Sequence, residues 1–276
     1  MDIYFNLYMT SILFWNINKK PLLEEIEELC HDNDIDILIL AECQLSNAQI
    51  LPAINSNSKN EYRKLFNPVS NLSLFCRHPP IQSVTLIQDE KRIIIRGISL
   101  ANGNSFTLVA LHLPSKLYKS DIEQGVHSPR VARRIEEAEN KVGHDRTLVI
   151  GDFNMNPFEV GMVSAEAFHA VMDRNIANKV SRKVDGEIYK YFYNPMWRLM
   201  GDDSNDFLGT YYYRAGSISY FWNTFDQVLL RHSLLGNFNS KNVSIISRIR
   251  HRNLIVNNKI DKFFSDHLPI IIKLDI

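Results

Sequence analysis

Cysteine is scarce in this chain, and the positions of the cysteines do not suit a zinc site or a set of disulfides. The 276 residues contain three cysteines, Cys30, Cys43 and Cys76, and no two of them form a Cys-x-x-Cys pair. This spacing argues against a zinc site and against a disulfide framework. Scattered free thiols suit a reducing compartment, so we expect a cytoplasmic location.

The chain also lacks an excess of charge of either sign. Lysine and arginine together number 31, aspartate and glutamate together also number 31, and the formal net charge at pH 7 is zero. A strongly basic coat for nucleic acid is therefore excluded, whereas a local basic groove is still compatible with the sequence.

Long hydrophobic runs and low-complexity linkers are missing as well. The apolar start, residues 1–15, is interrupted by Asp2 and Asn6 and is too short to span a membrane. It also lacks the basic region and cleavage site of a signal peptide. We interpret it as an opening strand, with an extension outside the core before Met9. Without a linker, one domain over residues 1–276 is expected.

The hydrophobic 45% of the chain is arranged mainly in short β-like runs. An acidic helix is predicted over residues 21–32, with its glutamates on a solvated face, and further helices over 129–142 and 159–177. Strands are predicted over residues 11–15, 35–41, 62–66, 72–76, 81–87, 92–100, 106–111, 148–150, 225–230, 244–249 and 270–274.

Polar side chains stand at the ends of several predicted strands. They are Asn16, Glu42, His112, Asp152 with Asn154, and Asp266 with His267. Taken singly, each has an ordinary explanation: an Asp-x-Asn pair usually belongs to a turn, and a lone histidine usually packs or faces solvent. Asp226 is different because it lies within an apolar strand, where a carboxylate is costly unless it has a specific partner.

Strand ends on one edge of a layered fold converge, so these residues can meet in one pocket. The pocket would carry carboxylates, amides and imidazoles. Hard oxygen ligands without clustered thiols suit Mg²⁺ or Mn²⁺ better than zinc. This set of groups fits the metal-assisted attack of water on a phosphate ester.

Six short motifs in this order resemble the endonuclease/exonuclease/phosphatase superfamily, which includes DNase I-like nucleases. They are Phe14-Trp15-Asn16, Ala41-Glu42, Leu111-His112-Leu113-Pro114-Ser115, Ile150-Gly151-Asp152-Phe153-Asn154, Thr224-Phe225-Asp226-Gln227-Val228 and Ser265-Asp266-His267-Leu268-Pro269. Each motif alone is weak, but the ordered set covers nearly the whole chain. The resemblance implies an α+β fold, a four-layer sandwich of two packed, mainly antiparallel β-sheets with helices outside.

The resemblance also implies roles for individual residues. Glu42, helped by Asn16 and Asp266, would hold Mg²⁺ or Mn²⁺ against the scissile phosphate. Asp152 would orient or deprotonate the attacking water, and Asn154 would fix its position. His267, held by Asp226, would bind a phosphoryl oxygen, and His112 would contact the phosphate or protonate the leaving oxygen. Which residue is the base and which the acid stays open.

Two subgroups of this family fit the sequence poorly. Abasic-site endonucleases tend to have glycine after the first motif and Gln-Glu-x-Lys at the glutamate, where this chain has Asn16-Ile17-Asn18-Lys19 and Ala41-Glu42-Cys43-Gln44. Inositol-phosphate phosphatases carry Asn-Tyr-Arg after the central motif, where this chain has Asn154-Met155-Asn156.

The expected activity is that of a metal-dependent phosphodiesterase, with a nuclease acting on DNA or RNA as the leading hypothesis. The aromatic segment 189–222, with Tyr213 and Trp222, and the helix arginines Arg130 and Arg133 are the candidate substrate contacts. Two alternatives remain: an enzyme acting on a small phosphorylated metabolite or lipid headgroup, and a binding module that has lost its chemistry.

Overall fold

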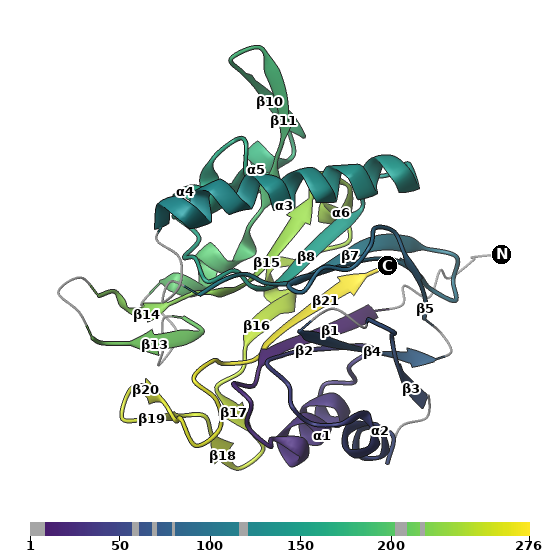
Figure 1. The fold of residues 1–276 in the computed structure, drawn as a ribbon, viewed down its shortest axis with the longest axis vertical. Helices are drawn as coiled ribbons and strands as arrows, with labels where there is room; N and C mark the ends of the chain where they lie inside the picture. The colour runs from purple at the N-terminus through teal and green to yellow at the C-terminus, as the bar shows by residue number, and fades with distance from the viewer. Residues whose placement is uncertain are drawn as a thin grey trace.

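Two β-sheets pack face to face, and helices cover their outer surfaces (Figure 1). The computed structural model describes residues 9–56, 61–67, 71–78, 81–115, 121–201, 209–215 and 219–276, without the side chains of residue 78 and residues 121–126. The predicted extension before Met9 lies outside the described residues. Among the described helices, none is long and apolar enough to cross a membrane.

The first sheet has six strands and contains both the first and the last strand of the described chain. One of its neighbouring pairs, β1 with β2, is parallel, and the others are antiparallel. In spatial order its strands are β16 (Val243–Ile245), β21 (Ile270–Asp275), β1 (Met9–Asn16), β2 (Ile37–Ala41), β4 (Leu72–His78) and β3 (Glu61–Lys64).

The second sheet has seven strands and is also mainly antiparallel. Its parallel pairs are β7 with β8 and β9 with β12. In spatial order its strands are β5 (Gln82–Thr85), β6 (Ile93–Ser99), β7 (Ser105–His112), β8 (Thr147–Asp152), β15 (Asp226–Arg231), β12 (Phe192–Tyr193) and β9 (Ala170–Val171). The predicted architecture of two mainly antiparallel sheets is confirmed.

The alternation of side chains along each strand divides the interior into three apolar clusters. On β1, Ile12 and Phe14 enter the cluster between the sheets, whereas Leu13 and Trp15 face the helical layer. This is the period of two expected of strands that are buried on both faces. Because both sheets share the central cluster, we expect the chain to unfold as one cooperative unit.

Helices close the two outer faces. Helices α1 (Leu23–Asp32) and α2 (Asn47–Ile54) cover the first sheet, and α3 (Asp121–Val142) lies across the second (Figure 1). Val131, Ile135 and Ala138 of α3 are buried against the second sheet, and Val142 is partly buried there. Shorter helices are α4 (Val160–Val163), α5 (Arg174–Ala177), α6 (His232–Leu235) and the 3₁₀ turns Pro195–Met200 and Ser240–Asn242.

The predicted helix over residues 159–177 is wrong. Helix α4 ends at Val163, and the chain then adds the edge strand β9 beside β12. The Asp173 side chain accepts a hydrogen bond from the backbone N–H of Asn175 at 2.7 Å and so starts a separate helix, α5. Apolar periodicity alone did not distinguish these short elements from one helix.

The solvated face that we predicted for α1 is only partly solvated, because Glu25 and Glu28 are buried and Glu24 is exposed. Arg250 bonds to Asp32 at 2.9 Å and to Glu28 at 3.0 Å, and Arg252 also pairs with Glu28. Both arginines come from the small ribbon β17 (Arg248–Ile249) and β18 (Arg252–Asn253). This ribbon ties the segment before the last strand to the first helix.

Three other two-stranded ribbons project from the sandwich (Figure 1). The ribbon β13–β14 contacts one of the strand-end residues singled out in the sequence, because Tyr211 pairs with His267. The ribbons are β10 (Ser181–Val184) with β11 (Glu187–Lys190), β13 (Tyr211–Tyr213) with β14 (Phe221–Asn223), and β19 (Ile255–Val256) with β20 (Lys259–Ile260).

Gly151 allows β7 and β8 to approach closely just before Asp152. A Cβ atom at this position would lie 1.9 Å from the backbone oxygen of Leu111, and backbone cannot yield as a flexible side chain can. Close approach of two chains is a common reason for glycine within a strand.

We predict that Gly151→Ala lowers the free energy of unfolding by about 3 kcal/mol or more, because the added methyl must push two paired strands apart. Urea denaturation measures the change. Gly236→Ala is the matched control, since a Cβ there meets nothing within 4 Å. Similar losses in the two variants would contradict this explanation.

Candidate active site

Four polar residues continue the inner, apolar face of their strands to one edge of the sandwich. Ile12 and Phe14 precede Asn16 at the same alternation, and Leu148 and Ile150 precede Asp152. His112 and Asp226 occupy the equivalent places on β7 and β15. Both are register partners of Asp152 in the neighbouring strands. The site is therefore the polar end of the layer between the two sheets.

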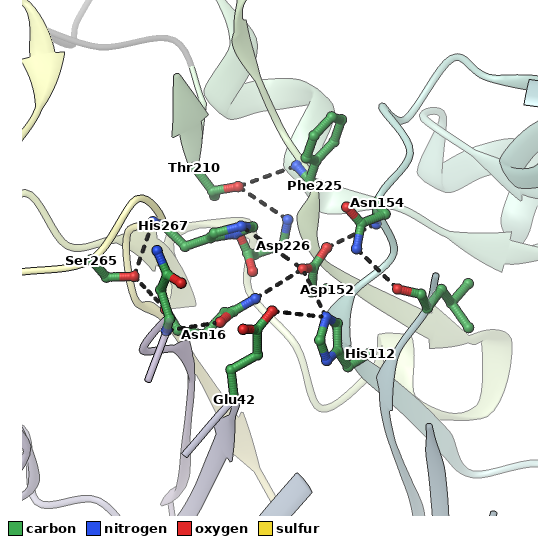
Figure 2. Close-up of polar contacts among 12 residues, drawn as sticks. Asn16, Glu42, His112, Asp152, Asn154, Thr210, Phe225, Asp226, Ser265 and His267 are labelled. Atoms are coloured by element: carbon green, nitrogen blue, oxygen red, sulfur yellow. Dashed lines mark hydrogen bonds and ion pairs between the residues drawn. The ribbon is translucent and has the colours of Figure 1, made fainter. Parts of the chain in front are cut away.

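Glu42 reaches the same place by a different route. It follows β2, and simple alternation from Ala41, which faces the inner layer, would turn it away. The backbone of Glu42 has φ +49°, in the left-handed region, which breaks the alternation. Figure 2 shows its carboxylate pointing toward His112 and Asp152, and its Oε1 lies 3.6 Å from His112 Nε2.

Asp152 lies at the centre of the cluster, and its side chain is 1% exposed. Its Oδ1 accepts a hydrogen bond from the backbone N–H of Asn154 at 2.8 Å, and its Oδ2 accepts one from Asn16 Nδ2 at 3.1 Å. The same Oδ2 lies 3.7 Å from His112 Nε2 and 3.9 Å from His267 Nε2. Both oxygens of the carboxylate thus accept a hydrogen bond, and Oδ2 also faces two imidazoles (Figure 2).

Asp226 has the specific partner that its burial demands. Its Oδ2 lies 2.8 Å from His267 Nδ1. Burial raises the pKa of the Asp226 carboxyl, and the charge of His267 opposes this. Burial would lower the pKa of His267, but Asp226, Asp152 and Asp266 outweigh it and raise that pKa well above its ordinary value. His267 is therefore an imidazolium at neutral pH, with Nε2 directed at Asp152.

His112 has the opposite character. Burial lowers the pKa of its imidazole, and the charges of Asp152 and Glu42 offset this only in part. Its backbone oxygen accepts a hydrogen bond from Arg92 at 3.1 Å, which places a guanidinium behind the ring. At neutral pH one histidine of the site is charged and the other neutral.

The last two predicted residues of the central set lie close by. Asn154 has φ +52°, and its Nδ2 donates to the backbone oxygen of Leu113 at 2.9 Å. Asp266 is half-buried beside His267 and acts on that ring through its charge. Among the described contacts none joins Asp266 to Glu42, so its part in the predicted metal site is not visible as a direct contact.

Three residues that the sequence analysis gave no role hold His267 in place. Ser265 Oγ donates to the backbone oxygen of Asn16 at 2.7 Å and accepts from the His267 N–H at 3.2 Å. Trp15 Nε1 donates to the His267 backbone oxygen at 2.9 Å. Thr210 Oγ1 accepts from the N–H groups of Phe225 and Asp226. In the sequence, Ser265 and Trp15 could have been noticed because they stand two and one positions before His267 and Asn16, respectively. Thr210 has no such signal.

An aromatic stack runs outward from His267. The Tyr211 ring lies 4.8 Å from the His267 ring and 5.2 Å from Phe225, and it stacks on Tyr213 at 6.5 Å with a 16° angle. Tyr213, predicted as a substrate contact, is 45% exposed at the outer end. Trp222, the other predicted contact, packs edge-on against Tyr212 on the same ribbon. Tyr211 was missed because nothing separates it in sequence from its neighbours.

The two predicted arginine contacts are exposed on helix α3. Because α3 begins at Asp121, Arg130 and Arg133 lie in its middle and not near its start, where we expected them. Arg130 pairs with Glu90 at 3.2 Å, and Arg134 binds the same carboxylate at 3.0 Å. None of the described contacts links either predicted arginine to Asp152 or its neighbours, so their role in substrate binding stays a prediction.

The oxygen atoms around Glu42 suit a hard divalent cation. Glu42 is the most accessible of the three carboxylates at the centre, 28% exposed against 1% for Asp152 and 0% for Asp226. Asn16 Oδ1 accepts one hydrogen bond, from the N–H of Asn18 at 3.1 Å, and has a second lone pair. Ligand atoms of Asp152, Asp226 and His267 also lie within 4.8 Å of one another. Carboxylate and amide oxygens without thiols match Mg²⁺ or Mn²⁺.

Solved structures with this fold cover almost the whole chain. The endonuclease domain of TRAS1, a telomere-specific non-LTR retrotransposon, is 12% identical with a TM-score of 0.57, over 97% of this chain and 99% of that one. Humanized D. rerio TDP2 is 17% identical with a TM-score of 0.56, over 96% and 98%. The 3′ phosphatase NExo from Neisseria, bound to a product DNA hairpin, is 14% identical with a TM-score of 0.53, over 97% and 100%.

At these identities the neighbours establish the fold, and they agree with the sandwich described above. No curated protein sequence matches the chain. The model of the Endonuclease/Exonuclease/phosphatase family matches residues 13–267, from the middle of β1 to the histidine paired with Asp226. Members of this family are hydrolases of phosphate ester bonds and generally depend on divalent metals. This chain therefore belongs to the Endonuclease/Exonuclease/phosphatase family.

Proposed function

We propose that this protein is a metal-dependent nuclease that cleaves phosphodiester bonds of DNA or RNA. One observation carries the proposal. The buried carboxylate of Asp152 faces the charged His267 and the neutral His112, and the accessible Glu42 lies next to His112. Hydrolysis of a phosphodiester needs an oriented water, a cationic group for the phosphoryl oxygens and a proton donor for the leaving oxygen. Asp152 would meet the first need and His267 the second, and His112 would meet the third once it has taken up a proton.

Asp152 would position the attacking water and accept its proton. Oδ2 is the oxygen that lies near both imidazoles, while Oδ1 accepts the Asn154 N–H. Asn154 fixes the carboxylate through its backbone and, as predicted, would help to place the water. Asn16 Nδ2 limits rotation of the same carboxylate from the other side. A fixed base loses little freedom in the reaction, which favours catalysis.

His267 would bind a phosphoryl oxygen through Nε2 and stabilise the charge that develops there. Asp226 keeps the ring in its charged form and fixes its orientation through Nδ1. His112 is neutral at neutral pH, so its Nε2 would contact the phosphate or the leaving oxygen as a hydrogen-bonding group, and the ring would have to take up a proton before it could protonate that oxygen. These assignments extend the roles that the family resemblance implies.

Glu42 and Asn16 would hold the divalent cation, with Asp266 contributing through its charge. When bound, Mg²⁺ or Mn²⁺ neutralises negative charge on the phosphate and withdraws electrons from phosphorus. The cluster of Asp152, Asp226 and His267 is better described as a hydrogen-bonded set, because Asp226 favours the protonated form of His267 and an imidazolium has no free lone pair for a metal.

Nucleic acid is the favoured substrate because aromatic rings lie beside the charged histidine. Tyr213 lies on the ribbon β13–β14 on the same face as Tyr211, which meets His267, whereas Trp222 is half-buried on the other face beside Tyr212. Exposed aromatic rings can stack on the bases of a single strand. In support, TDP2 from D. rerio has been solved with a single-strand DNA product.

The substrate prediction is tested with single-stranded DNA, duplex DNA, RNA, bis(p-nitrophenyl) phosphate and glycerophosphocholine, each with Mg²⁺. We expect cleavage of at least one nucleic acid. We expect Asp152→Asn to lower its kcat by about 10³-fold, because the base is lost while the shape is kept. Asp185→Asn, at an exposed turn, is the control. Turnover of only the small esters would replace the nuclease by a small-ester hydrolase, and no turnover would favour a binding module.

The metal assignment predicts that EDTA abolishes activity and that Mg²⁺ or Mn²⁺ restores it. We expect Glu42→Gln to raise the half-saturating Mg²⁺ concentration roughly 10-fold or more, because an anionic ligand becomes neutral. Titration calorimetry with Mg²⁺ checks the affinity directly. Glu61→Gln, on an exposed strand of the first sheet, serves as control. An unchanged Mg²⁺ affinity in Glu42→Gln would place the cation elsewhere.

The ion pair between Asp226 and His267 predicts how the pH dependence of kcat/KM changes when Asp226 is replaced. Asp226 raises the pKa of His267, so in Asp226→Asn the imidazolium should lose its proton at lower pH. We expect the alkaline limb of kcat/KM to move toward neutral pH by about one unit or more. The profile of wild type and variant, recorded on one substrate, measures it. A profile that falls in height without moving would show that Asp226 acts by position alone.

A further inference from the structure

Lys19 lies beside Glu42, the most accessible carboxylate of the site, in a backbone conformation that lysine rarely adopts. Lys19 has φ +60° and follows Asn18 at φ +46°, so two consecutive residues are left-handed. This region favours glycine, and a side chain there strains the backbone. Strained residues that persist in a well-packed structure often serve a site.

The backbone of Lys19 is fixed to the predicted metal ligand. Its N–H donates to the backbone oxygen of Glu42 at 2.9 Å, and the Lys20 N–H closes the turn on Ile17 at 2.9 Å. Asn18 is fixed in turn by Asn16 Oδ1 at 3.1 Å. The position of Lys19 relative to the cluster is therefore determined by strands β1 and β2, which pair in parallel with Asn16 opposite Ala41.

The side chain of Lys19, in contrast, is held loosely. Its Nζ lies 3.8 Å from Glu42 Oε2, which is longer than a hydrogen bond, and the side chain is 61% exposed. An exposed ion pair at this distance contributes little to stability. The strained position is thus not explained by the contact that Lys19 makes within the protein.

The charge of the site supplies a reason for a lysine here. The site contains four acidic residues, Glu42, Asp152, Asp226 and Asp266. Among the described contacts, the charged His267 is buried and paired with Asp226. A substrate with more than one phosphate would meet repulsion at the rim, next to Glu42. An ammonium group on a flexible stem above Glu42 can turn from the carboxylate to such a phosphate.

We propose that Lys19 is a specificity residue that binds a second phosphate of the substrate, next to the scissile one. This deepens and rests on the proposed function, because it assigns the substrate to a class that carries neighbouring phosphates, such as a nucleotide chain. It disfavours an ester with a cationic headgroup, which the ammonium group would repel.

The test compares two ligands that differ by one phosphate. Thymidine 5′-monophosphate has one, and thymidine 3′,5′-bisphosphate has two. Their affinities are measured by titration calorimetry with Mg²⁺ in the Asp152→Asn background, which suppresses turnover. We expect the bisphosphate to bind roughly tenfold more tightly, Lys19→Gln to remove this difference and Lys19→Arg to retain it. Lys20→Gln, which removes the adjacent lysine charge, should change neither affinity.

Strain gives a second, independent readout. Lys19→Gly should relieve the left-handed conformation, so its melting temperature should not fall and is expected to rise, while the preference for the bisphosphate is lost. Asp185, also left-handed at φ +49° but on the distant ribbon β10–β11, is the matched position. Asp185→Gly should leave the preference intact. A purely structural role for Lys19 would produce the reverse, a loss of stability with unchanged binding.

Salt dependence measures the same contact on a chain substrate. For a single-stranded oligothymidylate bound to the Asp152→Asn protein, Lys19→Gln should reduce the slope of log affinity against log salt by about 0.7, the value for one phosphate contact.

An equal preference for the bisphosphate in Lys19→Gln, or no preference in the parent protein, would overturn the proposal. If that preference depends on Lys19 but no nucleic acid is cleaved, the nuclease assignment fails and the second-phosphate site stands.

Discussion

The burial of negative charge at one edge of the sandwich is the constraint on which the rest of the site depends. Asp152 and Asp226 are almost inaccessible, and burying two carboxylates side by side is costly unless each has a partner. The 2.8 Å contact between Asp226 and His267 changes this, because it places a cation between the two acids. Support from Ser265, Trp15 and Thr210 then serves to keep that cation in one orientation.

The layered architecture explains why this edge was open to prediction. Strands buried on both faces are continuous apolar runs, so a polar residue that ends such a run is conspicuous. Asn16, His112 and Asp152 were found in this way, and Asp226 by its place inside an apolar strand. The contacts that bring them together follow from strand register, in which His112 and Asp226 both lie opposite Asp152, and the sequence alone did not specify that register.

Other features depend on information that local sequence does not contain. The φ of +49° at Glu42 redirects that side chain against the alternation, and no residue type signals it. The edge strand β9 interrupts an apparent helix because β12, more than twenty residues away, offers it a partner. The acidic face of α1 was predicted to face solvent, but its ion-pair partners Arg250 and Arg252 lie more than two hundred residues further along the sequence. Tertiary contacts decide each of these cases.

The contacts around His267 also have a consequence for how the protein is made. Trp15 and His267 are 252 positions apart, and Ser265 reaches Asn16 across 249. Strands β1 and β21 pair along their length, so the first sheet is completed only when the last strand arrives. Closing such large loops is slow, and a domain built on them folds late. During synthesis on the ribosome, Asp152 and Glu42 are therefore present long before they have the imidazolium that completes the site. A chain that ended before Ser265 would lack His267, the Ser265 hydroxyl that holds it and the last strand of the first sheet.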